Sequence, residues 1–146
     1  MKLNKLRTFA AVVLSFAAGS LITARFMHIR EAEAQSKRVF ELRVYHTLPG
    51  RLPALEARFK NDTVRIFKKH NMTSVGYWQP EDAPASENTL IYILAHASRD
   101  AATKNWAAFR DDPEWQKVSK ASEADGKIVD KVDSTFMDPL DFSAIK

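Results

Sequence analysis

Three residues that could bind an anion or move a proton stand at alternate positions of one short segment. Glu41, Arg43 and Tyr45 lie within RVFELRVYH, residues 38–46. In an extended strand, alternate side chains point to the same face, about 7 Å apart, so the three would form one polar row. Arg43 could then bind a carboxylate, and Tyr45 could donate a proton or a hydrogen bond. We favour the structural alternative, in which Glu41 and Arg43 pair with each other or with a second copy of the chain.

Histidines are the obvious candidates for metal or haem ligation and for general base catalysis, because imidazole titrates near neutral pH. His46 and His96 are expected at the ends of strands, and His70 at the end of a helix, where a cation complements the helix dipole. No two of them have the i, i+4 spacing of a helical metal pair. We therefore predict no metal and no cofactor, and allow a small organic ligand.

Aromatic side chains supply a second group of candidates. Trp78, Trp106 and Trp115 could roof an aromatic pocket together with Phe109. Trp106 and Phe109 have helical spacing, which favours a place in the core, whereas Trp115 follows a break and could cap a pair of helices. The resulting candidates for ligand binding are Glu41, Arg43, Tyr45, Trp78, His96, Trp106 and Trp115.

The sequence lacks the residues that several other kinds of chemistry require. The 146-residue chain has no Cys, which excludes a thiol nucleophile, a disulfide framework and a zinc–thiolate site. Its four Gly residues are scattered and form neither a phosphate-binding loop nor a Gly-x-Ser-x-Gly elbow. Of the net charge of +4, residues 1–35 carry +3, so the remainder is almost neutral and we predict no nucleic-acid partner. Catalytic residues stay unassigned.

Residues 1–35 have the pattern of an export leader. Met1–Arg7 is cationic, and residues 8–24 run for 17 positions without a charge. Ala32-Glu33-Ala34 supplies the small-x-small site that a signal peptidase needs, so cleavage would leave Gln35 first. We therefore expect a signal peptide, residues 1–34, and a periplasmic or secreted protein.

An uncleaved anchor is the alternative interpretation of the same segment. Charged residues between 25 and 33 separate the apolar run from the cleavage site. Seventeen apolar residues lie at the lower limit of what spans about 30 Å of hydrocarbon, so residues 8–24 could tether the protein to the inner membrane. The protein would contact a membrane only in that case. A mitochondrial presequence is a further alternative, although such segments are usually amphipathic.

Hydrophobic periodicity predicts a βαββαβ order for the domain of residues 36–146. Pro53 suits the first turn of a helix, Ser98 is a good N-cap, and Asp112 before Pro113 can restart a helix after a break. The nearly all-apolar third strand belongs in the middle of the sheet. The predicted strands are 38–46, 74–79, 89–97 and 128–137, and the predicted helices are 52–70 and 98–126, the second interrupted at 111–114.

This order predicts an α+β ferredoxin-like sandwich, in which a four-stranded antiparallel sheet has both helices on one face. A domain of about 110 residues buries only about two-thirds of its unfolded surface. We expect the other face to expose Tyr45, one side of the third strand and part of the last strand. An apolar patch of this kind usually marks an interface, so we expect a homodimer through the open sheet face and monomers from Tyr45→Lys.

Short motifs along the chain resemble the NIPSNAP family. Glu41-Leu42-Arg43-Val44-Tyr45 followed by Pro49-Gly50 is similar to the opening of that family, and Val75-Gly76-Tyr77-Trp78 is similar to its second strand. The most specific likeness is the segment from Trp106 to Trp115, and residues 139–143 are similar to its C-terminal motif. The resemblance covers about residues 38–143 and implies a dimeric α+β barrel.

The same resemblance implies little about chemistry, because that superfamily includes haem-degrading and cofactor-independent oxygenases, isomerases and binding modules. We expect an exported homodimeric NIPSNAP-like binding or interaction protein without an evident catalytic site. The alternative is a small cofactor-independent oxygenase or isomerase, or a haem-binding protein, that uses a cavity between sheet and helices. A core filled by Trp would favour the first, and an open cavity lined by Arg43, Tyr45 or His96 would favour the second.

Overall fold

Four segments within residues 38–146 form strands, namely β1 (Val39–Thr47), β2 (Thr73–Trp78), β3 (Thr89–His96) and β4 (Val129–Met137). The computed structural model describes residues 38–146, and the predicted leader with its cleavage and anchor alternatives lies outside them. The strands form one antiparallel sheet in the order β2-β3-β1-β4. The βαββαβ order is confirmed, and β3 lies inside the sheet as its apolar composition predicts.

The first helical region contains an irregularity that the sequence pattern does not reveal. It consists of α2 (Leu52–Arg58), a π-helical turn (Phe59–Thr63) and α3 (Val64–Lys69), where a single helix over 52–70 was expected. In the wider turn, the Thr63 hydroxyl donates to the Arg58 carbonyl at 3.2 Å. Arg58 ends α2 just before this turn, three residues after Leu55 on the inner face of the helix, and is 7% exposed.

The second helical region begins and restarts where the sequence predicts. The Ser98 hydroxyl accepts the N–H of Ala101 at 3.1 Å and caps α4 (Arg99–Asp111). The Asp112 carboxylate accepts the N–H of Glu114 at 2.9 Å and caps α5 (Pro113–Ser122), which starts with proline. α5 ends at Ser122, four residues before the predicted end at Gly126. Gly126 lies in the turn before β4, where its φ is 126°.

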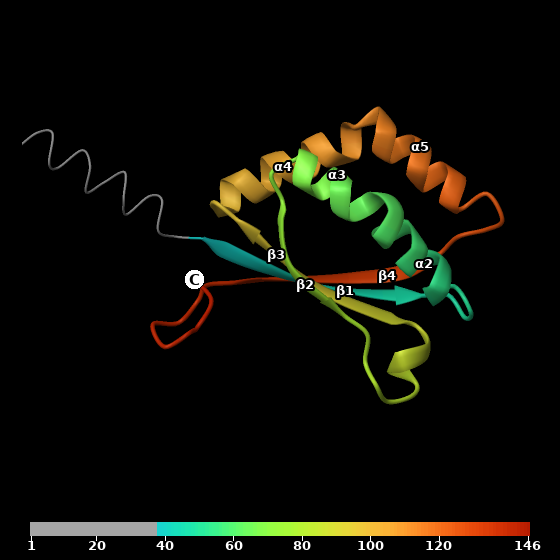
Figure 1. The fold of residues 1–146 in the computed structure, drawn as a ribbon, viewed down its shortest axis with the longest axis horizontal. Helices are drawn as coiled ribbons and strands as arrows, with labels where there is room; N and C mark the ends of the chain where they lie inside the picture. Colours follow the sequence, from blue (N-terminus) through green and yellow to red (C-terminus); the bar gives the residue numbers. More distant parts are fainter. Residues whose placement is uncertain (1–37) are drawn as a thin grey trace, which may run out of the picture. The chain divides into compact units, whose positions relative to one another are not determined.

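Helices α2, α3, α4 and α5 lie on one side of the sheet (Figure 1). The buried core fills the space between these two layers, with Tyr92 and Leu94 of β3 facing Ile66 and Phe67 of α3. Aromatic rings make up much of it, in edge-to-face contacts such as that of Phe67 with Trp106, whose ring centroids are 5.5 Å apart. The helix side of the sheet is therefore closed by packed side chains.

The opposite side of the sheet is apolar, and among residues 38–146 no helix packs on it. Strand register pairs Leu42 with Ile93 and Val44 with Ile91, on the face away from the helices. The indole of Trp78 lies on this face too and is 49% exposed. It lies against Gly76, where a Cβ would be 2.6 Å from the indole ring, so that position requires glycine.

The expected position of Tyr45 is wrong. Tyr45, with Glu41 and Arg43, faces the helices, and its ring meets Phe59 edge-on at 5.7 Å between centroids. The apolar row of β1, and not the polar row, forms the open face. Strand alternation is therefore confirmed, but the two faces are exchanged relative to the expectation.

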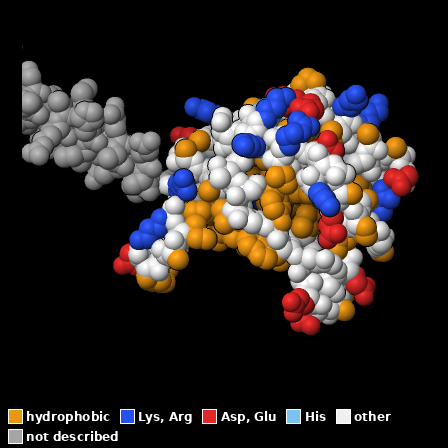
Figure 2. Space-filling model, viewed as in Figure 1, with side chains coloured by type: hydrophobic (Ala, Val, Ile, Leu, Met, Phe, Trp, Pro, Cys, Tyr) orange, Lys and Arg blue, Asp and Glu red, His pale blue; other side chains and the backbone are white. Residues whose placement is uncertain are grey.

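The chain ends in a tail, residues 138–146, beside this open face. Its Leu140, Phe142 and Ile145 are 60%, 83% and 54% exposed. Figure 2 shows hydrophobic side chains gathered below the helices, between the tail and the projecting β2–β3 connection. The tail adds apolar surface at one end of the open face, beside Phe40, Val75 and Ile93.

Candidate functional site

Five of the seven candidate residues meet in one buried cluster between the sheet and α4. Glu41, Arg43 and Tyr45 come from β1, His96 ends β3, and Trp106 comes from α4. The cluster forms because β1 and β3 are neighbours in register and the cap at Ser98 starts α4 directly after β3. The two candidates that lie elsewhere are Trp78 and Trp115.

Glu41 is the centre of the cluster and is 1% exposed. One carboxylate oxygen accepts from Arg43 at 2.8 Å and Ser134 at 2.7 Å. The other accepts from Trp106 Nε1 at 2.6 Å and from His96 Nε2 at 3.1 Å. Burial alone would raise the pKa of Glu41, but these four hydrogen bonds outweigh it and lower the pKa to about 2. The carboxylate is therefore ionised, and its negative charge is compensated inside the protein.

Arg43 supplies the positive charge of this pair. Its guanidinium lies 4.3 Å from the centroid of the Trp106 ring and 5.5 Å from that of Tyr45. Burial would lower the pKa of Arg43, yet the phenols of Tyr45 and Tyr92 and the Glu41 carboxylate raise it above its usual range. Glu41 and Arg43 pair within one strand of one chain, as the structural alternative for this row supposed.

His96 and the two tyrosines complete the cluster. Because Glu41 has no proton, Nε2 of His96 carries the hydrogen in their contact, and Nδ1 has no partner among the described residues. The Tyr92 hydroxyl donates to that of Tyr45 at 3.3 Å, and burial raises the pKa of Tyr92 well above 10.0. Most polar atoms of the cluster are thus bonded to one another.

The space around this cluster is filled by side chains. Trp106 packs against Phe67 and Phe109 with ring centroids 5.5 and 5.6 Å apart. Four cavities at the surface of residues 38–146 are lined by other side chains, and Arg43, Tyr45 and His96 line none of these four. Chemically, the arrangement holds an ionised carboxylate and a guanidinium in fixed positions within the core.

The remaining candidates are apart from this cluster. Trp115 stacks on Phe109 with centroids 4.4 Å apart and joins α5 to the core, whereas Trp78 lies on the open face. His70 contacts the Asp112 carboxylate at 2.6 Å, and His46 contacts Asp133 at 3.2 Å. Within residues 38–146, no group of three or more acidic or histidine side chains is placed to hold a metal ion.

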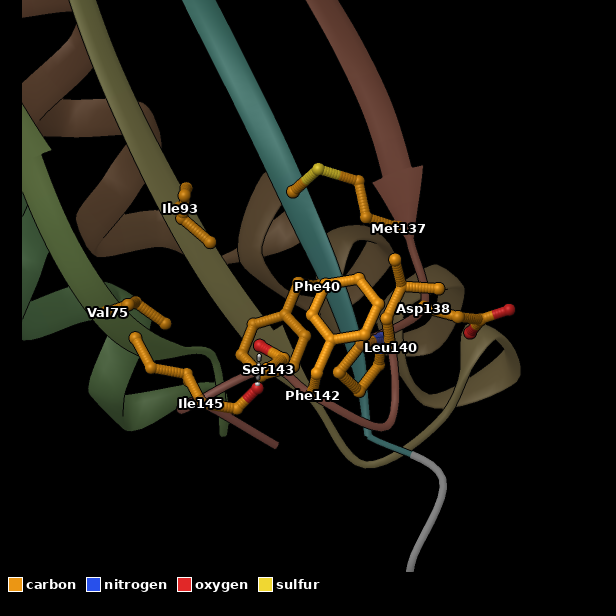
Figure 3. A pocket seen from close by; sticks show the side chains of 10 residues that line it. Phe40, Val75, Ile93, Met137, Asp138, Leu140, Phe142, Ser143 and Ile145 are labelled. Carbon is orange, nitrogen blue, oxygen red and sulfur yellow. Dashed lines mark hydrogen bonds between the residues drawn. The ribbon is translucent and has the colours of Figure 1, made fainter.

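A cavity of about 370 Å³ lies at the tail end of the open face. Figure 3 shows its two sides, with Phe40 and Ile93 of the sheet opposite Phe142 and Ile145 of the tail. Its lining is almost entirely apolar, and the Ser143 hydroxyl beside it already donates to the Ile145 carbonyl at 2.8 Å. This cavity can accommodate apolar side chains or an apolar ligand.

Sequence reasoning missed three contributors to these sites. Ser134 and Tyr92 join the Glu41 cluster through pairing of β1 with β4 and β3, and their positions could have been found only from the strand register. Arg58 is the third, a buried cation at the end of α2 that was not among the predicted inner positions of the helix. A π-helical turn follows it, and the sequence carries no simple signal for such a turn.

The order of elements, the sheet and the helices on one face define an α+β fold of the dimeric α+β barrel class. SnoaB of Streptomyces nogalater, a cofactor-independent oxygenase, has this fold at 12% identity and a TM-score of 0.50, over 76% of this chain and 100% of that one. At this identity the likeness concerns the fold alone. Within Arg38–Lys146, none of the helices has the length and apolar character needed to span a membrane.

The sequence model of the NIPSNAP family matches residues 40–144, and the chain belongs to that family. A NIPSNAP family protein of unknown function from Agrobacterium tumefaciens is 26% identical, with a TM-score of 0.65 over 75% of this chain and 94% of that chain. An uncharacterised NIPSNAP-like domain protein from Burkholderia xenovorans is 17% identical, with a TM-score of 0.63 over 73% and 88% of the two chains. No protein with a curated description is detectably similar in sequence.

Proposed function

We propose that this NIPSNAP-family chain is a homodimeric binding module, in which two copies pack their open sheet faces together. The observation that carries the proposal is the apolar face formed by β1 and β3, with Leu42 opposite Ile93 and Val44 opposite Ile91. Exposed apolar patches of this extent on a soluble domain usually mark an interface. The position of Tyr45 beneath the helices strengthens the argument, because the row that remains open is the apolar one.

A second copy is the partner that suits this surface best. An isologous dimer places the same patch on both sides, so two apolar faces cover each other without a second sequence. A stable interface needs about 800 Å² from each partner, and a four-stranded sheet face extended by an apolar tail can supply such an area. Charged residues lie at one end of the face, where Lys131 and Asp133 pair at 2.8 Å. They would form the polar rim.

The Glu41 cluster supports a structural role and not a catalytic one. The acid, the base and the cation of the candidate site bond to one another, and packed aromatic rings surround them. A general acid or base needs a substrate within about 3 Å, and a filled core gives it none. The cluster acts as an internal framework that fixes β1, β3, β4 and α4.

The experiment that tests the dimer is Ile93→Lys in the middle of the open face. A lysine there places a charge in the apolar contact, so we expect monomers, whereas the unmodified chain sediments as a dimer at micromolar concentration. Thr103→Lys, on the exposed side of α4, is the control and should remain dimeric. Identical sedimentation of the Ile93→Lys protein and the unmodified chain would show that the open face is not the interface.

Export is part of the same proposal and rests on the leader pattern of residues 1–34 alone. The cationic start, the apolar run and Ala32-Glu33-Ala34 support a cleaved signal peptide and a periplasmic or secreted protein. The mass of the protein purified from its own cells tests this part. A chain that begins at Gln35 supports cleavage, and a chain that keeps residues 8–24 supports the membrane anchor.

A further inference from the structure

A second site candidate lies on the helix layer, away from both the open face and the Glu41 cluster. A groove of about 660 Å³ runs between α2 with its π-helical turn and α5. Its volume is in the range of pockets that bind small molecules. Small apolar side chains leave the groove open along both helices, namely Ala54, Ala57, Val118 and Ala121.

The polar group at this groove is the guanidinium of Arg58. Arg58 lines the groove, and its side chain is 5% exposed. One nitrogen donates to the Ser122 hydroxyl at 3.2 Å, and the Glu123 carboxylate is 3.7 Å away, beyond hydrogen-bond distance. The Nε of Arg58 is buried without a partner among the described residues, as are the Nε atoms of Arg43 and Arg51. A buried donor left unpaired in this way is uncommon, because it loses its water without gaining a protein partner.

Arg58 and the partly buried Arg43 differ in how their positive charges are compensated. Arg43 donates to Glu41 at 2.8 Å, and its pKa is raised. Burial lowers the pKa of Arg58, and the nearby Glu123 carboxylate offsets this only in part. Arg58 therefore holds a positive charge that the protein itself compensates incompletely.

Two acidic side chains, Glu114 and Asp62, also line the groove. Glu114 binds Arg65 at 2.6 Å and Lys69 at 3.2 Å, whereas Asp62 lies 3.7 Å from Arg65. Lys117 adds a second cation to the lining. The carboxylate that lies close to Arg58 itself is that of Glu123, at 3.7 Å.

We propose that this groove binds a small organic acid, with its carboxylate on Arg58 and its apolar body along the alanines of α2 and α5. The planar guanidinium matches a carboxylate, and a bond to Nε would satisfy the unpaired donor. The π-helical turn directly after Arg58 supports the assignment, because such turns occur frequently at functional sites. The site is independent of the sheet-face dimer.

Calorimetric titration of the full chain with octanoate tests the proposal. We expect saturable one-to-one binding per chain, with 1-octanol and octylamine bound at least about tenfold more weakly, since each lacks the charge-assisted bond to Arg58. Acetate, which has the head group without the apolar body, should also bind more weakly. Equal affinity for octanoate and 1-octanol, or tighter binding of octylamine, would overturn the assignment.

Three variants locate the bound acid. Arg58→Met should abolish octanoate binding, whereas Arg110→Met, on the exposed side of α4, should not change it. Ala57→Leu fills the groove from an exposed position, so it should reduce the affinity about tenfold without perturbing the core.

Besides Arg58→Met and Ala57→Leu, the third test variant is Glu123→Gln. It should remain folded, and we expect it to raise the affinity for octanoate and not to lower it. It removes the one carboxylate that competes for Arg58 but retains an oxygen for the Ile128 N–H, which Glu123 accepts at 3.2 Å. Octanoate affinity should rise about threefold or more in this variant, and Glu81→Gln on the exposed β2–β3 connection should leave it unchanged. An unchanged or weaker affinity in Glu123→Gln, or full affinity in Ala57→Leu, would refute a site at this groove.

Discussion

Glu41 is the buried carboxylate of the row Glu41, Arg43 and Tyr45, which lies inside a small hydrophobic core. A buried carboxylate is costly unless hydrogen bonds and an opposite charge replace its water. Here Arg43 supplies the charge, and Trp106 and Ser134 donate directly to the carboxylate. The cost is therefore offset only while every partner is in place, so this residue should be sensitive to substitution.

The substitution Glu41→Gln keeps the shape of the side chain and removes its charge. The guanidinium of Arg43 then remains buried without compensation, so we expect the free energy of unfolding to fall by about 3 kcal/mol. Urea unfolding at neutral pH measures this difference. Glu81→Gln in the exposed β2–β3 connection is the matched control, and a loss of similar size there would contradict the role of Glu41.

The same pair of proteins makes a prediction about pH. The pKa of Glu41 is about 2 in the fold, below its ordinary value of 4.5, so the folded state favours the ionised form. Its contribution to stability is complete above about pH 5 and is lost as the pH falls towards 2. The difference in stability between the unmodified chain and Glu41→Gln should therefore shrink over that range. A constant difference would mean that the carboxylate charge is not what stabilises the cluster.

Sequence reasoning identified this row but placed it on the wrong face. Alternation shows that Glu41, Arg43 and Tyr45 share one side, and it does not show which side the helices cover. The partners that make the polar row tolerable inside are far away in the chain, His96 55 positions later and Ser134 93 positions later. Without those contacts the apolar row appears to be the better inner face.

The starts of α4 and α5, in contrast, were predicted correctly, because the residues that define them are close together in the sequence. Ser98 and Asp112 each accept a backbone N–H two or three residues later, and both caps were predicted from neighbouring residues. The π-helical turn at Phe59–Thr63 was not predicted, since the apolar spacing of a helix continues through it. The burial of Arg58, which precedes this turn at the proposed acid-binding groove, could likewise be found only in the structure.

Loss of the N-cap of α4 should have a measurable effect on the stability of the protein. Ser98→Ala removes the hydroxyl that accepts the Ala101 N–H, so the first turn of the helix that carries Trp106 loses a partner. We expect a loss of about 1 kcal/mol in the free energy of unfolding, measured with urea. Ser119→Ala removes the same hydroxyl from a position inside α5 and should not lower the free energy of unfolding. Equal effects of the two substitutions would argue against the cap.

The domain of residues 38–146 has one closed side and one open side. Helices and aromatic rings close the side that holds the Glu41 cluster, and paired apolar residues of β1 and β3 form the open side (Figures 1 and 2). The sequence predicted the fold, the family and the existence of an open face, because these follow from the order of elements and from local motifs. It could not identify the residues of that face, which depend on long-range pairing.

Native mass spectrometry of the protein purified from its own cells tests the central claim, self-association through the open sheet face, most directly. We predict a particle that contains two copies of the chain at micromolar concentration. The Ile93→Lys protein should appear as single chains under the same conditions. A single copy of the unmodified chain, with the apolar face stable in water on its own, would contradict the account.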